Sequence, residues 1–185
     1  VLFANEKFSY HLISSAEKYF RYKWYWVKNT GTNFFHAKRM PIRHVEEILV
    51  FSKSTPTNYY PQITDGHVPT NSGKGRNTGN CYAGKSKVDY EGGITTRFPK
   101  NILEFDKVHN YERTHPNEKP VALIEYLIKT YSKEAEVILD SCAGTGSSLL
   151  AAKNLGRQFI GIEKEEKYYN IILERLSTNY AIHGK

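Results

Sequence analysis

The chain has 185 residues and two cysteines, Cys81 and Cys142, so we expect one domain of ordinary size whose core needs neither disulfide bonds nor a metal. The cysteines are too few and too far apart for a secreted scaffold, no apolar run is long enough to span a bilayer, and no signal-peptide pattern is visible, which favours the cytoplasm. The net charge of +7 favours a polyanion such as nucleic acid over a membrane surface, although plain solubility would explain the same charge.

The first 53 residues are predicted to form strands and one helix. Val1–Ala4 is a strand candidate, and the spacing of apolar residues predicts a helix over Phe8–Phe20. The alternating, aromatic segment Tyr22–Lys28 and the apolar segment Glu47–Lys53 are typical of strands, the second of them buried. Residues 33–43, between these strands, are basic and aromatic together.

Residues 54–98 differ from the rest in composition. Gly, Asn, Thr, Ser, Lys and Tyr predominate, and long apolar runs disappear. A long segment of this kind within a compact domain is usually functional or disordered. We therefore interpret it as an insert within a single domain spanning residues 1–185.

Regular patterns return in residues 99–185. The predicted elements are, in order, a helix that begins at Pro120, the strand Glu136–Leu139, the helix Ser147–Asn154, the strand Gln158–Ile162 and the helix Lys164–Tyr180. An order of strand, helix, strand and helix predicts an α/β fold in which helices cover a parallel sheet.

The strongest functional signal lies in residues 137–148, where a buried strand leads through Asp140 into a glycine turn and then a helix. Gly144 and Gly146 let the backbone come close to a ligand, and the helix N-terminus offers free N–H groups. Leu149 stands where a dinucleotide site needs its third glycine, and no lysine follows the turn as in a phosphate-binding loop. A cofactor without a pyrophosphate, such as S-adenosylmethionine (SAM), fits better, although a structural turn would also explain the glycines.

Four other side chains are functional candidates, as are the histidines. Glu163 ends the next predicted strand, where a carboxylate accepts hydrogen bonds from both ribose hydroxyls of a nucleoside, and NAD would use the same geometry. Cys142 is interpreted as a small packing residue and not a nucleophile, because no histidine base is near in sequence. Trp24 and Trp26 share one face of a strand, which favours core packing over base stacking. The histidines show no metal-ligand spacing, so no metal is expected.

With these residues the sequence resembles the prokaryotic and phage DNA amino-methyltransferases, which methylate adenine N6 or cytosine N4. Residues 140–148 resemble the SAM motif of that family, Asp-x-Phe-x-Gly-x-Gly-Thr-Thr, with Cys142 in place of the aromatic residue. Residues 115–120 resemble its His-Pro-x-x-Lys-Pro motif, and residues 33–53 resemble the strand pair and loop after its catalytic motif. The likeness is strongest to the circularly permuted group, in which the catalytic half precedes the SAM half.

The resemblance implies a Rossmann-like, circularly permuted SAM-dependent methyltransferase fold. It implies that residues 54–98 are a target-recognition insert, that residues 99–185 are the SAM-binding half, and that duplex DNA is the substrate, with the target base flipped out. The residues expected to bind the cofactor are Asp140, Cys142, Ala143, Gly144, Gly146, Ser147, Glu163, His115, Lys119 and Pro120. The residues expected to contact DNA phosphates are Lys38, Arg39, Arg43, Lys74 and Arg76.

The family's catalytic loop, Asp/Asn/Ser-Pro-Pro-aromatic, has no counterpart in the sequence, because none of the seven prolines follows another. The resemblance implies that this loop and its strand would precede Val1, which itself reads as the middle of a strand. That strand would be central in the sheet, between the SAM strand and Val1–Ala4. We therefore expect at least one central strand to be missing from this chain, and we assign no catalytic residue.

The expected activity is methyl transfer from SAM to an exocyclic amino group of DNA, adenine N6, as part of a restriction–modification system. A non-catalytic DNA-binding remnant is one alternative. A subunit of a split methyltransferase, completed by a second polypeptide, is another. The third is an RNA or small-molecule methyltransferase, for which a basic insert at residues 54–98 would have no purpose.

Overall fold

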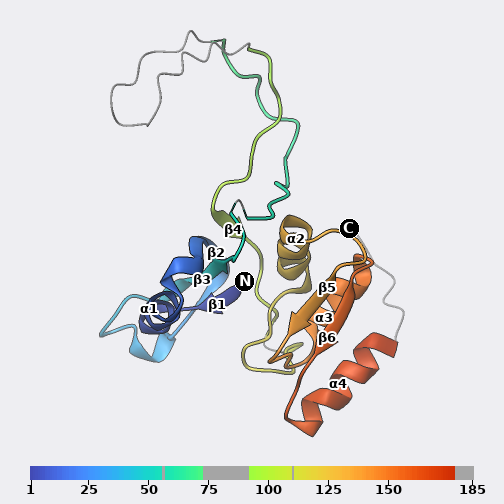
Figure 1. Cartoon of the computed structure of the whole chain (residues 1–185). Coiled ribbons are helices and arrows are strands. Elements are labelled where there is room, and N and C mark those ends of the chain that lie inside the picture. The colour runs from blue at the N-terminus through green and yellow to red at the C-terminus, as the bar shows by residue number, and fades with distance from the viewer. Residues whose placement is uncertain (56, 73–91, 110, 178–185) are drawn as a thin grey trace. The chain divides into compact units, whose positions relative to one another are not determined.

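A computed structural model describes residues 1–55, 57–72, 92–109 and 111–177 of the chain (Figure 1). The chain forms two compact units. The main unit comprises residues 1–60 and 100–185, and it contains every helix and strand of the described residues. The insert unit comprises Pro61–Pro99, whereas the composition of the sequence predicts an insert that begins at residue 54.

Four strands of the main unit form a mixed sheet in the order β1-β3-β2-β4 (Figure 1). These strands are β1 (Leu2–Ala4), β2 (Phe20–Thr32), β3 (Arg43–Phe51) and β4 (Ile102–Glu104). β3 is antiparallel to β1 and to β2, and β4 is parallel to β2. β1 and β2 therefore run in the same direction, and their C-terminal ends lie at the same edge of the sheet.

The three strands predicted in this half are confirmed, although β2 and β3 are longer than expected. The helix predicted over Phe8–Phe20 ends too late: α1 covers Glu6–Ser15, and a short 3-10 helix, Glu17–Tyr19, follows. Ala16 has non-helical backbone angles, φ −144° and ψ 37°, and ends the helix, and Phe20 already belongs to β2. The three-residue strand β4 was not predicted, because so short a segment carries no periodicity.

Trp24 and Trp26 are core residues, as predicted, and their side chains are 3% and 2% exposed. The Trp24 Nε1–H donates to the Tyr131 hydroxyl at 2.5 Å, and the Trp26 Nε1–H donates to the Phe105 carbonyl oxygen at 2.7 Å. Both indole groups are therefore buried with their polar atom satisfied. Burial raises the pKa of Tyr131 far above its usual range, so this phenol stays a neutral partner.

The second half of the main unit contains a pair of parallel strands and three helices. β5 (Val137–Asp140) pairs with β6 (Gln158–Gly161), and α3 (Ser147–Asn154) connects them. The other helices are α2 (Val121–Tyr131) and α4 (Glu166–Ser177), and no described helix is long and apolar enough to cross a membrane. The described bounds agree with these predictions to within a few residues, and the predicted end of the last helix, Tyr180, lies outside the described residues. Pro120 is the N-cap of α2 and not its first residue.

α2 joins the two halves of the main unit. Its Leu123 and Leu127 belong to the core cluster of the four-stranded sheet, together with Trp24 and Trp26. On a second face, Ile124 and Ile128 pack with Ala151 and Ala152 of α3. A single helix thus contributes side chains to both cores, which places the β5–β6 pair beside the four-stranded sheet.

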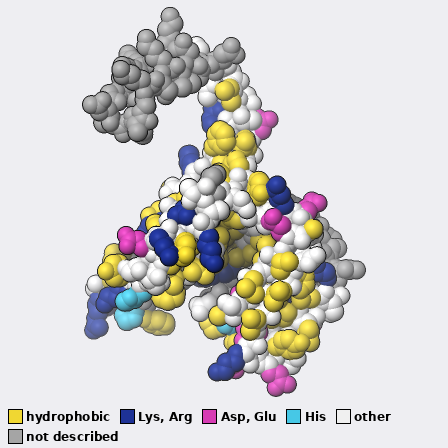
Figure 2. Space-filling model, in the orientation of Figure 1, with side chains coloured by type: hydrophobic (Ala, Val, Ile, Leu, Met, Phe, Trp, Pro, Cys, Tyr) yellow, Lys and Arg dark blue, Asp and Glu magenta, His cyan; other side chains and the backbone are white. Residues whose placement is uncertain are grey.

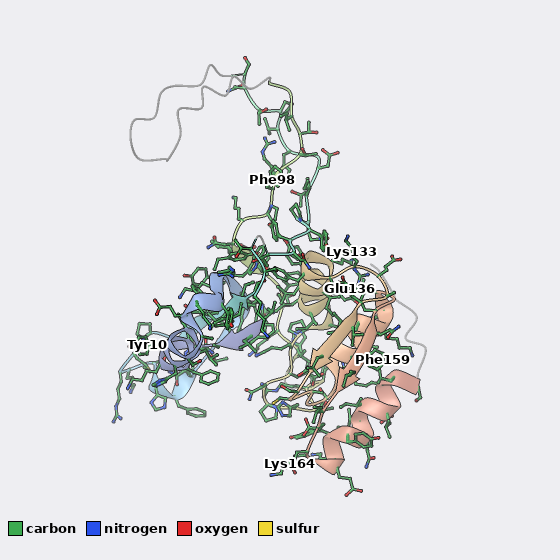
Figure 3. The ribbon with its side chains drawn as sticks, viewed as in Figure 1. Tyr10, Phe98, Lys133, Glu136, Phe159 and Lys164 are labelled. Atoms are coloured by element: carbon green, nitrogen blue, oxygen red, sulfur yellow. The ribbon has the colours of Figure 1, made fainter. Side chains whose placement is uncertain are left out.

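One face of the β5–β6 pair is left uncovered by the described residues. Ile138 and Phe159 (Phe159 is labelled in Figure 3) pack with the cluster formed by α2 and α3. The apolar side chains that alternate with them are Val137, Leu139, Ile160 and Ile162, and each is more than half exposed. Parallel sheets are normally buried on both faces. This face therefore has the composition of a surface that another element covers.

A buried ion-pair network connects β3 to the segment before α2. Glu46 accepts hydrogen bonds from Lys28 Nζ at 2.7 Å and from Lys119 Nζ at 2.5 Å. The Lys119 ammonium also lies 5.0 Å from the centre of the Phe3 ring. Burial alone would raise the pKa of Glu46, but the two ammonium groups outweigh it and hold the pKa below its ordinary value of 4.5.

Replacing Glu46 by glutamine should lower the free energy of unfolding by about 3 kcal/mol, because two partly buried ammonium groups lose their counter-charge. Urea denaturation followed by circular dichroism measures this. Because folding lowers the pKa of Glu46, its stabilisation is present above pH 4.5 and is lost as the pH falls through the folded value. The variant should therefore lose less stability on acidification than the parent. Glu47→Gln, which removes a more exposed partner of Lys23, is the control, and an equal loss in both variants would contradict the prediction.

Candidate functional site

β5 continues into a tight bend, residues 140–148, that leads into α3. Gly144 and Gly146 have φ values of +54° and +78°, in the left-handed region that favours glycine. A Cβ atom on Gly146 would lie 2.9 Å from Cγ1 of the buried residue Ile172 in α4. The sequence folds this way because both the backbone conformation and the close approach of α4 require a residue without a side chain at this position.

Asp140 stabilises the bend by accepting hydrogen bonds at both its side chain and its backbone. Its carboxylate accepts a hydrogen bond from the Cys142 backbone N–H at 3.0 Å and another from the Ser148 hydroxyl. Its carbonyl oxygen accepts one from the Ile162 N–H at 2.9 Å, which fastens the bend to the end of β6. Cys142, interpreted from the sequence as a small packing residue, has a free and exposed thiol and lines the cleft described below.

Glu163 lies at the same bend. Its Oε1 accepts a hydrogen bond from the Glu165 backbone N–H at 2.9 Å, and its Oε2 accepts one from the Gly144 N–H at 2.7 Å. These N–H groups, that of Glu165 first, lower the pKa of Glu163, so the side chain is an anion at neutral pH. Each carboxylate oxygen retains a further lone pair, which a ligand hydroxyl group can use.

His115 lies beside the bend. Its ring is 4.6 Å from the Tyr168 ring of α4, edge to face, and its Nδ1 accepts a hydrogen bond from the Asn117 N–H at 3.1 Å. A Cβ atom on Gly144 would lie 3.8 Å from the His115 ring. The histidine is therefore held in place between α4 and the glycine turn.

A partly buried arginine connects the segment before α2 to the bend, a contact that was not predicted from the sequence. Arg175 of α4 donates from Nη1 to Glu118 Oε1 at 2.9 Å and to the Thr145 carbonyl oxygen at 2.9 Å. The Glu118 side chain is 6% exposed and also accepts a hydrogen bond from the Thr114 N–H at 3.1 Å. Glu118 occupies an unspecified position of the His-Pro-x-x-Lys-Pro motif, and Arg175 is distant in sequence, so no local pattern indicates the contact.

These elements border a cleft of about 730 Å³, within the size range of small-molecule sites. The predicted cofactor residues that line it are Asp140, Cys142, Ala143, Gly144, Ser147, Glu163, His115 and Lys119. Gly146 and Pro120 were also predicted but do not line it. Part of the wall is apolar, with Val1–Phe3 on one side and Val137–Leu139 on the other. Figure 2 shows a hollow in which hydrophobic side chains predominate.

Lys38, Arg39 and Arg43, which were predicted to contact DNA, do not line this cleft. Lys38 and Arg39 are exposed in the loop between β2 and β3, and Arg43, the first residue of β3, lies 3.4 Å from the Glu6 carboxylate at the start of α1. Lys74 and Arg76, also predicted to contact DNA, lie outside the described residues. The structure thus brings eight of the predicted cofactor residues to one cleft and places three of the predicted DNA contacts in or next to a separate loop.

The model of the N6/N4 DNA methylase family matches residues 4–174. The chain belongs to this family. It is 43% identical over 76 residues to the type II methyltransferase M.HindIII of Haemophilus influenzae, which is 41% of this chain and 25% of that protein. It is 30% identical over 156 residues to M.BglII of Bacillus subtilis, which is 82% of this chain and 41% of that protein. The matched segments therefore cover 25% and 41% of the length of these relatives.

Solved DNA methyltransferases share the fold of this family member. The structure of the M1.HpyAVI–SAM complex matches with a TM-score of 0.61 and 22% identity, over 95% of this chain and 72% of that one. The cytosine-N4-specific PvuII DNA methyltransferase matches with a TM-score of 0.63 and 16% identity, over 96% and 60% of the two chains. The predicted α/β class and the resemblance to DNA amino-methyltransferases are thereby confirmed.

The two glycines at the ends of α3 allow a matched test of the bend. Gly156 has a φ of +68° and no atom within 4 Å of the place that a Cβ atom would take, so Gly156→Ala should cost about 1–2 kcal/mol for the backbone alone. Gly146→Ala meets Ile172 as well and should cost about 1–3 kcal/mol more. Urea denaturation of both variants measures the difference. Equal losses would show that α4 does not constrain the bend.

Proposed function

We propose that the cleft binds SAM and that this chain is the cofactor-binding part of a DNA methyltransferase that modifies an exocyclic amino group, adenine N6. The observation that carries the proposal is the ionised Glu163 carboxylate fixed beside the glycine bend. Glu163 would hold the ribose hydroxyls, the bend would admit the cofactor close to the backbone, and His115 would close the side of the site. SAM supplies the electrophilic methyl group, so the protein needs mainly to orient the accepting amino group.

Isothermal titration with SAM tests the cofactor assignment. Glu163→Gln should weaken binding about 10- to 100-fold, because hydrogen bonds to a charged acceptor are lost. Glu165→Gln is the matched control: its side chain does not line the cleft, and its backbone N–H still holds Glu163. Binding should be unchanged in the control. No heat of binding with the parent chain, or equal losses in the two variants, would count against SAM in this cleft.

For the DNA, we propose that Lys38, Arg39 and Arg43 contact phosphates and that the insert unit recognises the target sequence. Within the insert unit, residues 61–72 and 92–99 run antiparallel, with a bridge between Thr64 and Arg97. The His67 N–H donates to the Thr95 carbonyl oxygen at 3.1 Å. In the sequence, Lys74 and Arg76 lie between these two segments, outside the described residues. Paired segments on either side of a basic stretch of sequence suit a DNA contact better than the RNA or small-molecule alternatives.

We further propose that a strand outside these 185 residues completes the sheet between β1 and β5, and that it carries the catalytic loop in a permuted order. Two observations support this. Among the described residues, β1 and β5 each form an edge of their sheet, and residues of both strands line the same cleft. Both strands therefore have an unpaired edge that a further strand would occupy. One face of the β5–β6 pair also exposes four apolar side chains. A strand added at the edge does not cover a face, so we propose that the segment that supplies the strand also supplies an element that packs on this face. The strand would come from the same polypeptide or from a second one.

Expression together with the reading frame immediately upstream tests this completion. Methyl transfer from radiolabelled SAM to DNA is expected only in the completed enzyme, and nucleoside analysis distinguishes N6-methyladenine from N4-methylcytosine. Leu139→Arg, on the uncovered face, should abolish transfer, because a buried arginine without a partner is costly. Leu173→Arg, on an exposed position of α4, should retain it. Full transfer with Leu139→Arg would show that nothing covers this face.

A further inference from the structure

Two adjacent phenylalanines project from the loop between β2 and β3. The side chain of Phe35 is 100% exposed, and that of Phe34 is 74% exposed. Figure 2 shows hydrophobic, basic and histidine side chains gathered over this part of the main unit. A cluster of large apolar side chains at a loop tip indicates a surface that is covered when the protein engages its partner.

The backbone of this loop holds the phenylalanines in place. Asn33 adopts a left-handed φ of +74°, and its carbonyl oxygen accepts a hydrogen bond from the His36 N–H at 3.0 Å. The Ala37 N–H donates to the Phe34 carbonyl oxygen at 3.0 Å, and the Arg39 N–H donates to the His36 carbonyl oxygen at 2.8 Å. These successive turns present Phe35 outward from an ordered backbone, which reduces the entropy lost on binding.

The charge of the loop identifies the partner. Residues 33–43 contain Lys38, Arg39 and Arg43 and no acidic residue. Lys38 and Arg39 are exposed, and neither has an ion-pair partner within the described part of the chain. An apolar protein segment would fit the phenylalanines alone. Duplex DNA fits both features, since its phosphates face the cations and its base pairs offer apolar surfaces once they are unstacked.

The position of the loop in the sheet also agrees with a DNA contact. It follows β2, whose C-terminal end lies at the same edge as that of β1. Arg43, the first residue of β3 after the loop, is 3.4 Å from Glu6, which is two residues after β1. Phe3 of β1 lines the cleft proposed to hold the cofactor. DNA that delivers a base to this cleft therefore passes close to the loop.

We propose that Phe35, supported by Phe34, is a wedge that enters the base stack of DNA beside the target base and fills the space that the flipped base leaves. Lys38 and Arg39 hold the flanking phosphates. The inference rests on the proposed function, because a base that leaves the stack creates the space. It assigns a separate role to the aromatic residues of a loop otherwise proposed to contact only phosphates.

Fluorescence anisotropy tests the wedge without knowledge of the recognition sequence. The probes are a short labelled duplex and the same duplex with one abasic site, where the space already exists. The parent chain should bind the abasic duplex at least about fivefold more tightly, since an aromatic side chain gains stacking there without the cost of unstacking. Phe35→Ala should abolish this preference, and Phe35→Trp should restore it. Tyr10→Ala, which removes an exposed aromatic residue of α1 (Figure 3), should leave it unchanged.

The salt dependence separates stacking from phosphate contacts. Phe35→Ala should leave the slope of log affinity against log salt concentration unchanged, whereas Lys38→Ala should reduce it by about 1 and weaken both duplexes equally. A preference that is absent in the parent, or that survives Phe35→Ala, overturns the wedge while DNA binding stands. Failure of the parent to bind either duplex overturns the wedge and the proposed DNA interaction together.

Discussion

The left-handed backbone at Gly144 and Gly146 is the constraint on which the site depends. It turns the chain from β5 into α3 within a few residues and leaves the Gly144 N–H directed at the Glu163 carboxylate. It also presents the Thr145 carbonyl oxygen to Arg175, which in turn holds Glu118. One short bend therefore fixes the end of β6, helix α4 and the segment before α2 relative to one another. The bend, the end of β6 and the segment before α2 contribute residues to the cleft, and α4 supports them from outside it.

The two halves of the main unit differ in how completely they bury their apolar surface. The four-stranded sheet encloses two tryptophans whose indole N–H groups are both hydrogen-bonded, so this half has a finished core. The β5–β6 pair is packed on one face and open on the other. The exposed apolar residues alternate regularly along both strands, so they form one apolar face and are not scattered singly over the surface. The β5–β6 pair therefore has an apolar face that no described residue covers.

The parts that the sequence predicted well depend on contacts between near neighbours. Helix α3 has the predicted bounds, Ser147–Asn154, because its start is set by the glycine turn and its end by the loop that follows. Glu163 lies at the bend because the carboxyl ends of adjacent parallel strands meet at one edge. The parts that were missed depend on residues far apart. Arg175 meets Glu118 only after α4 folds back, and nothing near Ala16 in the sequence signals that α1 stops there.

Lys119 belongs to the family motif, but its ammonium group contacts another side chain of the protein. It lines the cleft, as the family motif implies, but its ammonium group is paired with Glu46, 73 positions earlier in the chain. A lysine without this partner would place a free positive charge on the wall of a site proposed to hold a sulfonium cation, and the two would repel each other. Pairing with Glu46 reduces that repulsion and connects the segment before α2 to the four-stranded sheet. Under the proposed function, Lys119 is thus a positioning residue, and Glu163 provides the anion that faces the ligand.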